Sequence, residues 1–179
     1  MEKKISIKGE NVMNAYKRAS EEQKELLENI MERVKTFEDA CEVLGEDHQY
    51  VKAYREWMRI SYADCKDITA HLKLRIICEA LNDVFKSKFA DNEFRYYPWF
   101  FIYTKDGYEK LNDDEKKECR VVGNSSRKYV FGCIVSASAR IESSYSFSVY
   151  GSRIALKTRE LAKYCSKQFI DIWADYLYA

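Results

Sequence analysis

The residues best suited to binding chemistry are cations in the C-terminal third, where positive charge is concentrated. Residues 127–167 contain eight basic and two acidic side chains, although the whole chain of 179 residues has a formal net charge of only +1. Arg159, Lys163 and Lys167 are spaced by four, which places them on one row of a helix. Because Arg can engage a phosphate bidentately, this segment predicts a surface for an anionic partner. The predicted partner-binding cluster is Arg140, Arg153, Lys157, Arg159 and Lys163.

Two structural interpretations of these cations remain open. The helical row can be the solvated face of an ordinary amphipathic helix. Alternatively, Arg153 or Arg159 can pair with Glu142 or Glu160 and stabilise the fold instead of a complex. In favour of binding, aromatic residues are interleaved with the cations, as on surfaces for RNA, single-stranded DNA or acidic proteins.

The segment from Arg95 to Tyr103 is dense in aromatic residues, which favour strands. Alternation places Tyr97 and Trp99 on the same face, and the opposite face is equally apolar. Helices must cover both faces, or one aromatic face contacts a partner. Burial is favoured because large exposed apolar patches are rare on monomers. Tyr97 and Trp99 are the residues expected at an aromatic contact face if one exists. Pro98 predicts an edge strand or a bulge.

Catalytic and metal-binding signatures are absent from the sequence. No glycine-rich phosphate loop, zinc-protease motif or nucleophile elbow occurs. The two histidines do not support acid–base chemistry: His71 is expected to be a packed helix residue and His48 a solvated loop residue. The six cysteines form no C-x-x-C pair, so no metal, cofactor or small-molecule substrate is predicted. They are interpreted as buried free thiols, with a Cys–His nucleophile built from distant residues as the alternative.

The first half of the chain has helical periodicity. Apolar residues from Val12 to Val34 stay in phase across Ser20, which favours one long helix over two. Thr36 followed by Asp39 predicts the start of a short helix over 36–44, and Gly45 is expected to end it in the left-handed region. Further helices are predicted over 50–62 and 68–85, the second being the central helix of the core.

The periodicity changes at Phe94. Strands are predicted over 94–103, 129–135 and 145–156, with a polar loop or short helix over 104–118 and an amphipathic helix after Thr158. The predicted fold class is α+β: N-terminal helices, a small antiparallel meander of about three strands, and a C-terminal amphipathic helix. We expect the 68–85 helix to pack on this sheet. The chain is predicted to be a single domain over 1–179, with the long helix in 1–35 as a possible separate arm.

No apolar run approaches the roughly 18 residues that a membrane helix needs, and Met1–Ile5 has no signal-peptide pattern. The expected location is therefore cytoplasmic, without membrane contact.

Three blocks of sequence resemble a family of small uncharacterised proteins from phages and prophages of Bacteroidota. They are the stretch 39–45, the stretch 70–82 leading to Tyr96-Tyr97-Pro98-Trp99-Phe100, and Gly151-Ser152-Arg153 with 158–162 and 167–169. The likeness covers about half of the chain, roughly 36–103 and 147–177. No activity or catalytic residue is established for the family, so the resemblance assigns no site.

The resemblance implies a genomic setting, and the setting suggests a function. Small phage accessory proteins without enzymatic motifs often act by binding a host machine. We therefore expect a non-catalytic inhibitor of bacterial antiviral defence, of the anti-CRISPR type, that binds a host protein or ribonucleoprotein such as a CRISPR effector. The alternatives are a direct RNA or single-stranded DNA binder of phage replication, a virion assembly component, and a cryptic enzyme.

Overall fold

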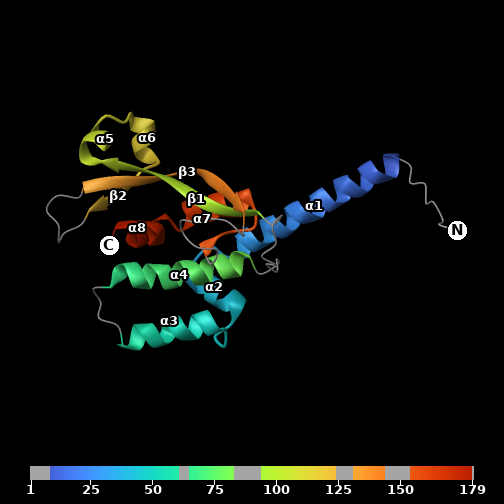
Figure 1. The fold of residues 1–179 in the computed structure, drawn as a ribbon, viewed down its shortest axis with the longest axis horizontal. Coiled ribbons are helices and arrows are strands. Elements are labelled where there is room, and N and C mark those ends of the chain that lie inside the picture. Colours follow the sequence, from blue (N-terminus) through green and yellow to red (C-terminus); the bar gives the residue numbers. More distant parts are fainter. Residues whose placement is uncertain (1–8, 61–64, 83–93, 124–130, 144–153, 179) are drawn as a thin grey trace.

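A computed structural model describes residues 9–60, 65–82, 94–123, 131–143 and 154–178. The first half contains four helices: α1 (Gly9–Arg33), α2 (Phe37–Leu44), α3 (Gln49–Ile60) and α4 (Lys66–Leu81). The second half contains β1 (Phe94–Thr104), α5 (Lys105–Glu109), α6 (Asp113–Lys117), β2 (Arg120–Gly123), β3 (Phe131–Ser143), α7 (Arg159–Gln168) and α8 (Ile170–Tyr178). Figure 1 shows their arrangement.

The predicted α+β fold class is corrected, because the part of the chain that the structure describes is mostly helical. Three differences account for this. The polar segment after β1 forms two capped helices, α5 and α6, although it has no apolar stripe. The predicted C-terminal helix is two helices, interrupted at Phe169, whose φ of −113° and ψ of 30° leave helical geometry. No described strand lies within 145–156.

The described strands form one antiparallel sheet in the order β1-β3-β2. β1 is therefore an edge strand, and the register shifts between Trp99 and Phe100, directly after Pro98. Both features confirm what Pro98 predicts. The strand beyond β3 is 120–123, instead of the predicted 145–156. Residues 144–153 lie outside the described residues, and Leu156 forms only an isolated bridge with Tyr96. The order is thus not the predicted meander.

The prediction that the 68–85 helix packs on the sheet is wrong, because other helices pack against it instead. α7 lies against β1 and β3, and α8 lies against β2 and β3. α4 packs on the other side of α8, and α2 and α3 pack on α4 (Figure 1). The burial predicted for Leu72, Ile76 and Leu81 of this helix is nevertheless right: Ile76 and Leu81 are completely buried, and Leu72 is half-buried. A helix that is apolar on several sides must be covered by other elements, but its composition does not identify which elements these are.

Local capping signals in the first half are confirmed. Thr36 Oγ1 accepts a hydrogen bond from the Asp39 N–H at 3.1 Å, and Asp39 Oδ2 accepts one from the Thr36 N–H at 2.7 Å. These bonds lower the pKa of Asp39, because hydrogen bonding favours its charged form. Gly45 ends α2 with a φ of 84°. Its ψ of 150° lies outside the left-handed helical region, in a conformation that only glycine adopts easily.

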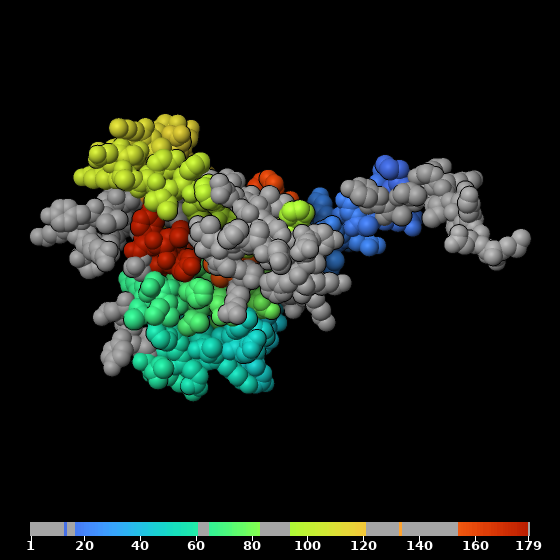
Figure 2. All heavy atoms as spheres, viewed as in Figure 1, coloured from blue at the N-terminus to red at the C-terminus, as the bar shows by residue number. Residues whose placement is uncertain are grey.

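α1 is one continuous helix across Ser20, as predicted. Its last turn joins the core, where Ile30 and the following Val34 are buried. Leu27 is half-buried against the core, whereas Met13 and Leu26 are 57% and 50% exposed. Figures 1 and 2 show the blue helix extending away from the rest of the molecule.

Asn82 connects the helical layers to the edge of the sheet. Its Nδ2 donates to the Ala155 carbonyl at 2.8 Å, and its Oδ1 accepts from the Lys157 N–H at 3.0 Å. Between these two residues, Leu156 exchanges both backbone hydrogen bonds with Tyr96 of β1, each at 2.8 Å. The Asn82 side chain therefore fixes the segment that leads into α7.

Replacing Asn82 with Ala is expected to destabilise the protein by about 2 kcal/mol, because two backbone groups near the core lose their partner. Asn82→Asp keeps the acceptor for Lys157 but places a carboxylate oxygen against the Ala155 carbonyl oxygen, so it should cost at least as much as Asn82→Ala. Urea unfolding followed by circular dichroism measures both. Equal stability of Asn82→Ala and the wild type would show that this connection is unimportant.

Candidate nucleic-acid or acidic-partner interface

The outer row of α7 is the strongest candidate for a binding surface. α7 begins after Thr158, whose Oγ1 accepts from the Leu161 N–H at 3.2 Å. The inner side of the helix is buried in the core through Leu161, Ala162 and Cys165. The opposite side therefore faces solvent, and it carries exposed Arg159, Lys163 and Lys167.

These three cations make no ion pair with any described side chain. Other surface cations do: Arg55 pairs with Glu46 at 2.8 Å, Lys52 with Asp47 at 2.9 Å, and Arg120 with Asp171. Arg159 and Glu160 form no ion pair, whereas the side chain of Glu142, the other predicted internal partner, lies outside the described part of the chain. We define Arg159, Lys163 and Lys167 as the basic row.

The remaining cluster residues are placed less directly. Lys157 is half-buried two residues before α7, and its backbone N–H is bound by Asn82. Arg140 belongs to β3, opposite Tyr97 in the register, and its side chain lies outside the described part. Arg153 also lies outside the described residues. The structure thus brings Lys157, Arg159 and Lys163 into one stretch and adds Lys167 through helical spacing.

Tyr97 is buried, as the favoured interpretation of this strand predicts, so it does not belong to an aromatic contact face. Its side chain is 4% exposed, and Trp99 is only half-buried. β1 changes character along its length: Arg95, Tyr97 and Pro98 are buried, whereas Phe101 and Ile102 are 53% and 57% exposed. The register shift after Trp99 breaks the simple alternation from which a continuous aromatic face was predicted.

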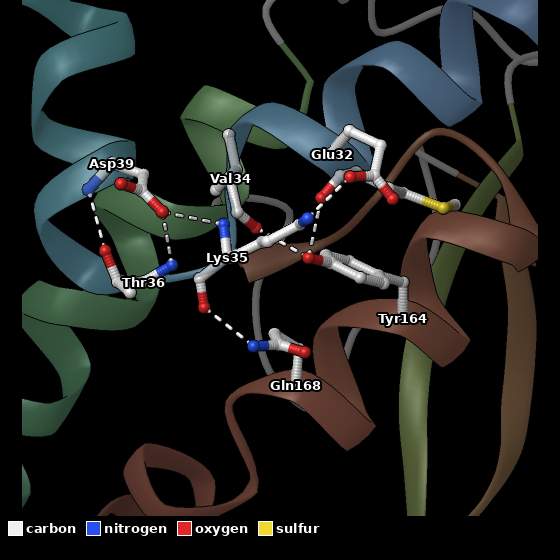
Figure 3. Close-up of polar contacts among 8 residues, drawn as sticks. Glu32, Val34, Lys35, Thr36, Asp39, Tyr164 and Gln168 are labelled. Atoms are coloured by element: carbon white, nitrogen blue, oxygen red, sulfur yellow. Dashed lines mark hydrogen bonds and ion pairs between the residues drawn. The ribbon is translucent and has the colours of Figure 1, made fainter.

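A groove of about 520 Å³, which the sequence did not reveal, separates α1 from α7. Figure 3 shows its floor, where α7 meets the corner between α1 and α2. The Tyr164 hydroxyl lies 2.8 Å from the Met31 carbonyl oxygen and 2.7 Å from that of Val34. Gln168 Nε2 donates to the Lys35 carbonyl at 2.7 Å. The only available signal was the spacing of Tyr164 and Gln168, which places two polar groups on one helix row.

The polar groups in this groove secure the fold. A hydroxyl has one proton, so Tyr164 donates to one of the two carbonyls at a time. Burial raises the pKa of Tyr164 first, and the negative charge of Glu32 raises it further. The hydroxyl therefore remains a donor near neutral pH and fixes the end of α1 beside α7.

Tyr164→Phe is expected to lower stability by about 1 kcal/mol, since it removes a hydrogen bond while keeping the ring. Because the bond is at the base of α1, hydrogen exchange should increase in residues 30–35 and change little in α3. Uniform exchange across both regions, or no loss of stability, would contradict this role.

The histidine environments give no acid–base pair. The His71 ring lies 5.6 Å from that of Tyr176, and burial, followed by the positive charge of Arg75, lowers its pKa. The prediction that His48 is simply solvated is wrong, because the residue is half-buried. Its Nδ1 accepts a hydrogen bond from the Tyr50 N–H at 3.3 Å at the start of α3. Both histidines therefore have structural contacts.

No group of three or more metal-ligating side chains comes together among the residues that the structure describes. Within the same residues, no helix combines the length and apolar character required to cross a membrane.

Comparison with known proteins adds no family. No family model, curated protein or solved structure matches this chain. The interface is therefore defined by its own geometry: a row of exposed cations that pair with no described acidic side chain, on a helix whose other side is anchored in the core.

Proposed function

We propose that this chain is a non-catalytic binding protein that engages an anionic partner through the basic row. One observation carries the proposal: Arg159, Lys163 and Lys167 are exposed on one side of α7 and have no described acidic partner. As far as the described side chains extend, an incoming negative group can engage each cation without first breaking an internal ion pair. Such a surface attracts acidic proteins and nucleoproteins, and the attraction weakens as salt screens it.

The rigidity of α7 supports the same proposal. The helix is fixed by Thr158 at its start, by Tyr164 and Gln168 against the α1–α2 corner, and by a buried inner side. Binding therefore costs little ordering of the backbone, and only the long side chains must become fixed. A firmly positioned row is what a stoichiometric inhibitor needs.

The biological setting of the proposal comes from the resemblance to phage and prophage proteins of Bacteroidota. The proposed partner is a host protein or ribonucleoprotein in the bacterial cytoplasm, with a CRISPR effector as the leading candidate. The protein would inhibit antiviral defence by occupying an anionic face of that machine, without a cofactor or small-molecule substrate.

Direct binding of RNA or single-stranded DNA is the second candidate, favoured by the same cations. Three contacts to a single strand predict a slope of about −2 when the logarithm of the binding constant is plotted against that of salt concentration. The fluorescence anisotropy of a labelled single-stranded RNA, titrated with the purified chain at several salt concentrations, measures this slope directly.

Capture from a Bacteroidota lysate, with and without nuclease, tests the proposal. We expect the tagged chain to retain a protein or ribonucleoprotein in both samples, and to release it as salt is raised. Recovery of nucleic acid alone, lost on nuclease treatment and matched by tight anisotropy binding, would favour the second candidate. Retention of nothing in either sample would contradict both.

A further inference from the structure

Two thiols meet at the edge of the sheet, where the chain enters β2. Cys119 directly precedes β2, and Cys133 lies on the central strand β3. Val121 is opposite Cys133 in the register, and Cys119 is two residues before Val121. Because alternate residues of a strand share a face, Cys119 and Cys133 lie on the same side of the sheet. Their Sγ atoms are 2.7 Å apart.

The two thiols differ in a way that suits a reaction in two steps. Cys133 is completely buried, whereas Cys119 is half-exposed. Burial, together with the neighbouring Cys119 thiol, raises the pKa of Cys133 to about 12, so Cys133 carries little thiolate at neutral pH. An oxidant from solvent can therefore reach Cys119 first, and the buried neighbour is already in contact with it.

We propose that Cys119 and Cys133 are a redox-sensitive pair that forms a disulfide on reaction with a small-molecule disulfide such as oxidised glutathione. The Cys119 thiolate attacks one sulfur of the oxidant, forms a mixed disulfide and displaces one glutathione thiolate. The Cys133 thiol then loses its proton and attacks Cys119 Sγ, which releases the second glutathione. Two protein thiols are oxidised by two electrons, and one small disulfide is reduced to two thiols.

The disulfide would constrain the segment that connects β1 to β2. α5 and α6 connect these strands, and Figure 2 shows them in yellow as an exposed lobe. Cys119 is at the end of this lobe, so a bond to β3 would fasten it to the central strand. Reversible disulfides of this kind in reducing compartments are typically redox-sensing.

Other cysteines of the chain provide comparisons within one experiment. Cys78 and Cys165 also contact each other, but both are completely buried between α4 and α7. The hydrogen bond with Cys165, and then burial, raise the pKa of Cys78 well above its usual value. Cys65 is half-exposed and contacts no other thiol in the described ranges. We expect the first pair to stay reduced and Cys65 to stop at the mixed disulfide.

The test treats the folded chain with oxidised glutathione, blocks remaining thiols with N-ethylmaleimide, and analyses tryptic peptides by mass spectrometry. We expect the peptide 118–120 to be joined to the peptide 129–140, with the loss of two hydrogens. A loop of about 15 residues is then closed, which should raise the melting temperature by roughly 6–12 °C, reversibly with dithiothreitol.

Two variants keep the result interpretable. Cys133→Ser should accumulate the mixed disulfide at Cys119, because the second thiol is absent, and Cys119→Ser should leave Cys133 unmodified. Recovery of both Cys119 and Cys133 as free thiols in the treated wild type, alkylated after unfolding because Cys133 is buried, would overturn the proposal. A wild type that stops at the mixed disulfide, exactly as Cys65 does, would overturn it as well.

Discussion

Trp173→Ala is expected to destabilise the protein by about 3–5 kcal/mol, the usual cost of deleting a buried Trp side chain. Trp173 is 1% exposed and lies on α8, between the sheet and α4. Its ring is 5.3 Å from that of Phe100 on β1 and 6.1 Å from that of Tyr176. Removing it leaves a cavity where the strand layer meets the helical layer, so both layers should lose stability together.

Urea unfolding with a near-ultraviolet and a far-ultraviolet probe measures this effect. Trp173→Phe keeps an aromatic contact with Phe100 and should cost less than Trp173→Ala. Met58→Ala is the matched surface control, since Met58 is 50% exposed on α3 and should change stability by less than about 0.5 kcal/mol. A loss below about 1 kcal/mol for Trp173→Ala would show that α8 does not join the two layers.

The position of α8 illustrates which part of the fold the sequence could not predict. Periodicity identified the residues of α4 that must be buried, and the capping pattern of Thr36 and Asp39 located the start of α2. Both are local properties of one segment. The neighbour of α4 depends on how distant segments compete for its surface, and here α8 takes the place expected for the sheet.

Short elements were only partly predicted for a related reason: a loop or a short helix was predicted over 104–118, but not two separate helices. α5 and α6 are five residues each, too short for an apolar stripe, and they are defined by the caps Thr104 and Asn112. β2 has four residues and pairs only with β3. Its pairing depends on α5 and α6 turning the chain back toward β3, which no feature of 120–123 alone indicates.

For the candidate interface, the sequence predicts that the three cations lie on one side of a helix. It does not predict whether acidic side chains pair with them. The spacing of Arg159, Lys163 and Lys167 determines their common side of α7. Whether acidic side chains neutralise them depends on tertiary structure, as Arg120 and Asp171 show: they are far apart in the chain and form an ion pair. Tyr97 shows the same dependence, because the sequence left both burial and a contact face open for it, and the tertiary structure buries it.

Reversing two charges of the basic row, by Arg159→Glu with Lys163→Glu, is expected to weaken partner binding at least about tenfold. The substitutions should not disturb α7. Glu at position 159 is in the first helical turn, where a negative charge is favourable. Glu at position 163 is four residues before Lys167, in the orientation that favours an ion pair. A loss of binding would therefore reflect the surface and not the fold.

Lys17→Glu with Arg18→Glu is the matched control. Both side chains are exposed on α1 and make no ion pair with a described residue, so the control changes the net charge equally at another site. We expect it to bind as the wild type does, apart from a small general effect of net charge. Equal weakening by the control would indicate non-specific attraction to total charge.

The affinity of the Arg159→Glu/Lys163→Glu variant for the captured partner, measured beside its melting temperature, tests the central proposal most directly. The proposal predicts binding at least about tenfold weaker than wild type at physiological salt, with a melting temperature within a few degrees of the wild type. Undiminished affinity in a variant that is fully folded would contradict the basic row as the working surface of this protein.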